Sequence, residues 1–200
     1  MKSLIEIKCE LTKMENEKNT NWSEIINYLY SQWQQQKENG ELCILLIQQL
    51  LEYLLAIDTP PFSPSVIYLH EKERLQTLLN ESITYGMEHC ITNKYFLWQI
   101  CYYLVSISTY YFLYDCLVKD DRDRLDLLQK LVNSAQALFP NSLLFFQFHE
   151  STNDYNYKWY MKLDNIQKET LLSEVNELCL QNNSKDQDIL NYFSSLLKCN

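Results

Sequence analysis

Two glycines in 200 residues constrain this chain more than any other feature of its sequence. Tight β-turns and phosphate-binding loops depend on glycine, so β-sandwiches and doubly wound α/β folds use it often. Gly40 and Gly86 are too few for such folds. Apolar residues at helical spacing cover most of the chain. We therefore predict an all-α fold, either an irregular multi-helix bundle or stacked helical hairpins, with about seven or eight helices.

The length and composition predict one helical domain over residues 1–200. Hydrophobic residues make up 46% of the chain and charged residues 22%, which is enough apolar surface to offset the ordering entropy of a core. Three of the four prolines fall in the segment Asp-Thr-Pro-Pro-Phe-Ser-Pro at 58–64. Because proline interrupts helices, we expect a proline-rich connection there.

Capping residues mark several helix starts. Asn21, three residues before Glu24, predicts a helix from Trp22 to about Asn39, with Gly40 in the C′ position that follows a helix. The pair at 92–93 predicts the start of an aromatic helix over 95–117. Residues 3–17 fit a modest helix or a strand-like start, and 143–148 fit a short helix or a strand. The last two predicted helices cover 164–182 and 184–199.

The apolar pattern also predicts core positions. The helix over 42–55 is apolar nearly all round, and Gly86 is a possible kink or stop in the helix that follows the prolines. An amphipathic helix begins after the charged turn at 119–123 and ends before Pro140, with its apolar side at Leu125, Leu128, Leu131, Val132 and Leu138. The predicted core includes Leu46, Leu50, Leu54, Trp98, Leu104 and Ile107.

Two segments come close to catalytic motifs without completing them. His70-Glu71-Lys72-Glu73-Arg74 begins like the zinc-protease motif, but Arg74 replaces the second histidine, so we interpret it as an exposed helix face with charge pairs four residues apart. Asp120-Asp121-Arg122-Asp123-Arg124 resembles an aspartate-rich magnesium motif, but Arg124 occupies the last aspartate position. The sequence therefore favours a protein that is not an enzyme and uses neither metal nor cofactor.

Charge and cysteine content indicate the surroundings and the partner. The net charge of −9 repels phosphate backbones, so we expect no direct nucleic-acid binding and favour a basic protein partner. Seven cysteines without a C-x-x-C pair indicate reduced thiols, and the charged N-terminal segment lacks a signal-peptide pattern, so we expect a cytoplasmic protein. The uncharged run 95–114 is rich in tyrosine, which fits a protein core better than a membrane.

Two clusters are candidate protein interfaces. One is the acidic turn, with Asp120, Asp121, Asp123 and Asp126. The other is a polar, aromatic loop and its flank, in which acids lie beside the aromatic residues that often dominate binding energy. Its candidate residues are Glu150, Asp154, Tyr155, Tyr157 and Trp159.

The acidic turn, the aromatic segment 95–117 and the opening Trp22-Ser23-Glu24-Ile25-Ile26 together resemble bacterial immunity proteins of contact-dependent growth inhibition systems. The resemblance covers the whole chain. It implies a cytoplasmic antitoxin that binds the toxin domain of a delivered surface protein, often a nuclease such as an RNase, and blocks its active site. The alternative is a cytosolic helical scaffold or a regulatory module that binds other proteins.

Overall fold

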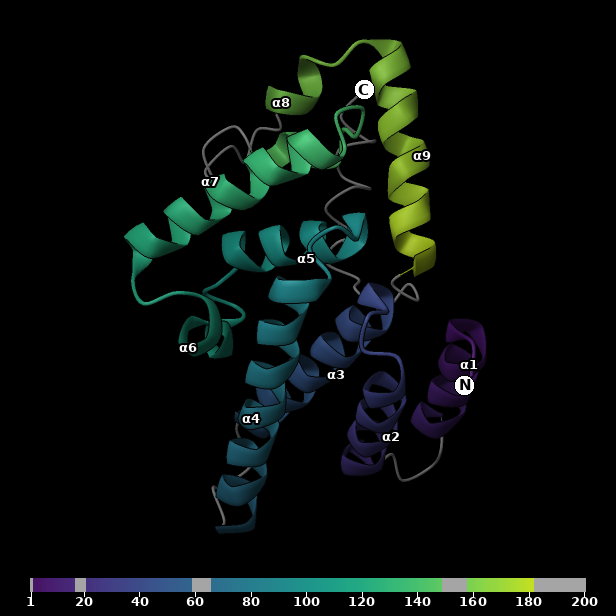
Figure 1. Ribbon diagram of the computed structural model, residues 1–200, viewed down its shortest axis with the longest axis vertical. Helices are drawn as coiled ribbons and strands as arrows, with labels where there is room; N and C mark the ends of the chain where they lie inside the picture. The colour runs from purple at the N-terminus through teal and green to yellow at the C-terminus, as the bar shows by residue number, and fades with distance from the viewer. Residues whose placement is uncertain (1, 17–20, 59–65, 149–157, 182–200) are drawn as a thin grey trace.

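The computed structural model describes residues 2–16, 21–58, 66–148 and 158–181, and within these ranges the chain is helical without a β-strand (Figure 1). The elements are α1 (Leu4–Glu15), α2 (Trp22–Gln35), α3 (Gly40–Asp58), α4 (Val66–His89), α5 (Lys94–Val105), the 3₁₀ helix η1 (Tyr111–Leu113), α6 (Tyr114–Leu117), α7 (Asp121–Leu138), the 3₁₀ helix η2 (Phe146–Phe148), α8 (Lys158–Met161) and α9 (Asn165–Gln181). Of these described helices, seven have at least 12 residues. The predicted all-α, multi-helix fold is confirmed.

The centre of the core is α3, which packs against α2, α4 and α5. Its apolar residues point to several sides because it has neighbours on several sides, as expected for a helix that is hydrophobic all round. In Figure 1, α5 and α7 run across the direction of α4, so the helices form an irregular arrangement. All six residues predicted for the core are at most 5% exposed.

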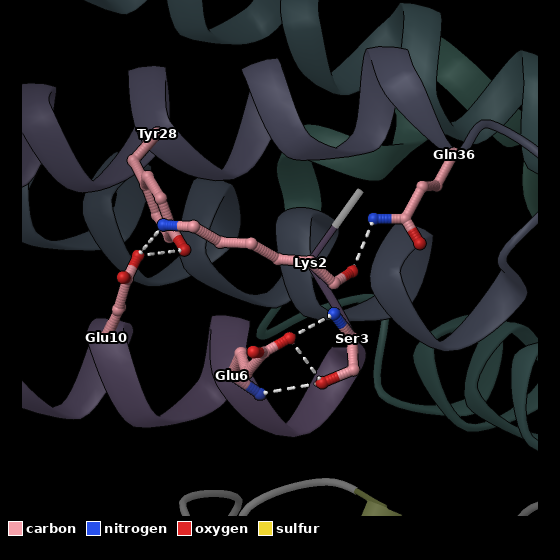
Figure 2. Close-up of polar contacts among 6 residues, drawn as sticks. All are labelled: Lys2, Ser3, Glu6, Glu10, Tyr28 and Gln36. Carbon is pink, nitrogen blue, oxygen red and sulfur yellow. Dashed lines mark hydrogen bonds and ion pairs between the residues drawn. The ribbon is translucent and has the colours of Figure 1, made fainter.

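Within the predicted segment 3–17, residues Leu4–Glu15 form the helix α1. Ser3 and Glu6 form a capping box: the Glu6 amide donates to Ser3 Oγ, and the Ser3 amide donates to Glu6 Oε2 at 2.7 Å (Figure 2). Polar contacts then hold α1 against α2. The Tyr28 hydroxyl and the Lys2 ammonium both donate to Glu10 Oε2, and Gln36 donates to the Lys2 carbonyl oxygen at 3.0 Å.

The segment that resembles a zinc motif instead joins α4 to α2. Arg74 forms two hydrogen bonds to the Glu71 carboxylate, at 2.6 and 3.0 Å. Glu71 also accepts a hydrogen bond from the Ser23 hydroxyl of α2 at 2.7 Å. The predicted charge pair four residues apart is therefore wrong in spacing, because Glu71 and Arg74 are three residues apart and Arg74 also reaches Asn27 on α2.

Gly40 does not follow α2 as a C′ residue; that prediction is wrong. The α2 helix ends at Gln35, and Gly40 is the first residue of α3. The Asn39 side chain accepts the Leu42 amide at 3.1 Å, as an N-cap residue does. A β-carbon at Gly40 would lie 2.9 Å from Asn93 Cβ, so glycine is needed here for close approach to the start of α5.

Gly86 is neither a kink nor a stop, because α4 continues through it to His89. A β-carbon at this position would lie 2.4 Å from Phe96 Cζ and 3.2 Å from Cys43 Sγ. Phe96 is fully buried on α5. The absence of a side chain at Gly86 therefore lets the Phe96 ring pack directly against the α4 backbone.

The predicted continuous helix over 95–117 is also wrong. Asn93 caps α5 as expected, accepting the amides of Tyr95 and Phe96, but α5 ends at Val105 and is followed by a turn, η1 and α6. Tyr103 and Tyr110 pack edge to face across this turn, with ring centroids 4.8 Å apart. Because α5 contacts α3 and α7 whereas α6 contacts α4, the break allows one apolar segment to bury residues in two places.

The structure describes the remaining predicted segments only in part. Residues 143–148 form turns and η2, without a strand. The helix predicted over 164–182 is present as α9, and Asp164 accepts the Gln167 amide at 2.8 Å as its cap. The helix predicted over 184–199 and most of the proline-rich connection, residues 59–65, lie outside the described residues.

Candidate functional site

Asp120 of the acidic turn is committed to the backbone. Its side chain accepts the amides of Arg122 and Asp123, both at 2.9 Å, and so caps the N-terminus of α7. A cap of this kind satisfies amides that have no partner within the helix. Asp120 therefore has a structural role as the cap of α7, and its part in a protein interface stays a prediction.

The Arg124 side chain is largely buried and contacts both α5 and the exposed Asp121. Its Nη1 donates to the Leu104 carbonyl oxygen of α5 at 3.1 Å, and its side chain is 15% exposed. Asp121 lies 3.5 Å from Arg124 Nε and accepts the Tyr114 hydroxyl at 3.4 Å, yet its side chain is 80% exposed. Asp121 is thus held by Arg124 and Tyr114 and still exposes most of its side chain to solvent.

Leu125 corrects the prediction for the apolar side of α7. It was expected in the buried stripe with Leu128, Leu131 and Val132, which are indeed buried. Leu125 is 48% exposed and Leu138 is 44% exposed, so the buried stripe is shorter at both ends than predicted. Helical phase does not separate Leu125 from this stripe, because Leu125 lies about 20° round the helix from the buried Val132.

Leu125 is surrounded by exposed polar groups, which we call the Leu125 face. With 3.6 residues per turn, its members share one side of the first two turns of α7. They are Asp121, Arg122, Leu125, Asp126 and Gln129, all exposed. The arrangement is an apolar side chain within a charged rim that carries one net negative charge.

The structure divides the predicted acidic cluster. Asp121 and Asp126 lie on the Leu125 face, whereas Asp123 lies about 160° round the helix from Leu125. Lys119 and Lys130 are also exposed near these acids, so the local surface carries both signs of charge.

The second predicted cluster cannot be placed. Glu150, Asp154, Tyr155 and Tyr157 lie outside the described residues. The backbone of Trp159 belongs to α8, but its side chain is also outside the described part of the chain. The aromatic interface therefore stays a prediction.

A shallow pocket of about 290 Å³ lies where the start of α5, the end of α7 and the middle of α9 meet. Its lining includes Lys94 and Glu174, whose charged groups are 3.2 Å apart, and the apolar side chains of Phe139 and Pro140. Glu174 also accepts the Leu143 amide at 2.7 Å. These contacts tie α9 to the loop after α7, and the two charged groups of the pocket already satisfy each other.

The described ranges hold no group of three or more His, Cys, Asp or Glu side chains that could bind a metal ion. In the same ranges, α3 is long and apolar enough to cross a membrane by length and composition, and 67% of its apolar window is buried inside the fold. Comparisons of the chain with protein-family models, curated proteins and solved structures found no match.

Proposed function

We propose that this protein is an immunity protein of a contact-dependent growth inhibition system, which acts in the cytoplasm by binding a basic nuclease toxin domain and covering its active site. The observation that supports this proposal best is the Leu125 face. Leu125 is 48% exposed at the start of a well-capped helix, where a partner that covers it would also meet the charged residues around it. The acids beside it match a basic partner.

Charge attraction and the burial of Leu125 contribute to different steps of binding. The net charge of −9 accelerates the encounter with a positively charged cleft, and this acceleration weakens as salt screens the charges. Burial of Leu125 then slows dissociation, because the leucine loses contact with water only in the complex. The α7 helix holds Leu125 and the acids beside it in place, since Asp120 caps the helix and Arg124 fixes it to α5.

The test begins with co-purification of the protein with the product of the neighbouring gene, followed by binding kinetics at several ionic strengths. Leu125→Ala is expected to speed dissociation and cost about 1–2 kcal/mol of binding free energy. Leu138→Ala is the matched control, because Leu138 lies on the same helix with similar exposure but at the other end. It should bind as the parent does.

A second pair of variants tests the charges. Asp126→Asn should slow association and flatten its dependence on salt, whereas Asp123→Asn, on the other side of the same turn, should change association less. If Leu125→Ala dissociates no faster than Leu138→Ala, and Asp126→Asn associates no more slowly than Asp123→Asn, the toxin binds elsewhere on the protein. Failure of the neighbouring gene product to bind at all would refute the immunity function and favour the scaffold or regulatory module.

A further inference from the structure

The pocket between α5, α7 and α9 combines two opposite charges with an apolar wall. Lys94 is the first residue of α5, where the helix dipole is positive. Glu174 comes from the middle of α9, and its side chain is largely buried. Phe139, the C-cap of α7, and Pro140 provide the wall. Three helices therefore bring the charged groups and the apolar surface to one place (Figure 1).

The ion pair balances the two charges but leaves hydrogen-bonding positions on both partners. Among the described contacts, Glu174 Oε1 accepts from Lys94 at 3.2 Å, and Oε2 accepts from the Leu143 amide at 2.7 Å. Because each carboxylate oxygen has two lone pairs, both can accept a second donor. Lys94 is paired with Glu174 and, at 3.8 Å, with Glu177, so its ammonium group keeps one proton for a further acceptor.

Ser142 adds a polar group that needs a partner. It lines the pocket from the turn after α7, where its amide donates to the Phe139 carbonyl oxygen at 3.0 Å. Its hydroxyl oxygen is buried and, in the described part of the chain, has no hydrogen-bond partner. A buried hydroxyl without a partner costs free energy, and an acceptor brought by a ligand removes that cost. Because Ser142 as a whole is partly exposed, rotation of its side chain can bring the hydroxyl to a bound ligand.

We propose that this pocket binds a free α-amino acid with an apolar side chain. The α-carboxylate accepts hydrogen bonds from Lys94 and Ser142, beside the positive end of α5. The α-ammonium donates to Glu174, near the negative C-terminal end of α7. The apolar side chain lies against Phe139 and Pro140. The inference does not rest on the proposed toxin.

The charges and the volume of the pocket select this class of ligand. An anion would be repelled by Glu174 and a cation by Lys94, whereas a zwitterion of matching polarity is attracted by both groups. The pocket volume of about 290 Å³ is close to the lower limit of about 300 Å³ for small-molecule sites. It therefore suits an amino acid better than a nucleotide.

The full-length protein is titrated with L-leucine and with L-valine, and binding is followed by two-dimensional NMR of the backbone amides. We expect saturable shifts at Lys94, Ser142 and Glu174, with a Kd of about 1 mM or below. Two fragments of leucine are the control ligands: 4-methylpentanoate lacks the amino group, and 3-methylbutylamine lacks the carboxylate. Each should bind at least about tenfold more weakly, because each loses one charge-assisted contact. The proposal is overturned if neither amino acid shifts these amides, or if either fragment binds as tightly as leucine.

Substitutions in the pocket test the assigned contacts. Ser142→Ala should weaken leucine binding by about tenfold, whereas Ser134→Ala, at a half-buried serine of α7 outside the pocket lining, should not. Glu174→Gln removes the charge but keeps an oxygen for the Leu143 amide, so circular dichroism should show a folded protein, with leucine affinity lower by about tenfold or more. Glu169→Gln, exposed on the same helix, is the matched control for charge. Unchanged leucine binding in both Ser142→Ala and Glu174→Gln would refute the site.

Discussion

Replacing Gly86 by alanine has two opposing effects on the stability of the protein. Helix propensity favours alanine, whereas the packing around α4 disfavours it. In an isolated helix, alanine is more favourable than glycine by about 0.8–1.0 kcal/mol. Gly86 lies inside α4, so helix propensity alone predicts that Gly86→Ala stabilises the protein. The new β-carbon would, however, lie 2.4 and 2.5 Å from two atoms of the Phe96 ring.

The contact with Phe96 decides the sign. Carbon atoms pack best at about 3.5–4.0 Å, so the ring or the helix would have to move by about 1 Å. Phe96 is fully buried on α5, and Cys43 Sγ lies 3.2 Å from the same β-carbon, so neither neighbour has free space on that side. Overpacking of this kind costs about 3 kcal/mol at the upper end of its range, which leaves a net loss of about 2 kcal/mol.

Urea denaturation followed by circular dichroism measures this loss as a lower midpoint with an unchanged slope. In thermal unfolding the same loss corresponds to a decrease of about 4–8 °C in Tm for a chain of this size. Thr84 provides the control because it is exposed on the same helix. Thr84→Ala should be more stable than Thr84→Gly by about 1 kcal/mol. A Gly86→Ala protein as stable as the parent, or more stable, would refute the close packing of Phe96 on α4.

Three further predictions concern the core, a cap and an ion pair. Leu50→Ala should cost about 2–5 kcal/mol in urea denaturation through lost burial and a cavity, because Leu50 is fully buried on α3; a loss under about half a kcal/mol would place this helix outside the core. Asp120→Ala should cost about 1 kcal/mol by removing the α7 cap, whereas the exposed Asp126→Ala should change stability little; equal losses would contradict the cap. Hydrogen bonds from Arg74, opposed in part by burial, lower the pKa of Glu71 below its ordinary value of 4.5. The ionised Glu71 carboxylate therefore stabilises the folded protein fully above pH 4.5, and this stabilisation disappears as the pH falls through the folded pKa. Unfolding measured between pH 7 and pH 3 should therefore depend less on pH in Glu71→Gln than in the parent, and identical pH profiles would contradict the pairing.

Local features of the sequence determined the all-α class, the caps and the central core. Asn21, Asn93 and Asp120 cap the helices that begin beside them, because a cap is formed by residues within three positions of each other. Leu50 and Trp98 are buried as predicted, because helical periodicity places an apolar stripe on one side whatever the partner is.

Tertiary contacts decided the features that a local pattern does not contain. Gly86 is needed for the approach of Phe96 from another helix, and that neighbour is not visible in the spacing of α4. The break after Val105 places α5 and α6 against different helices, and these contacts are between residues far apart in the sequence. Leu125 is half exposed because no described neighbour covers the start of the α7 stripe, and burial depends on what packs against a helix as well as on its periodicity.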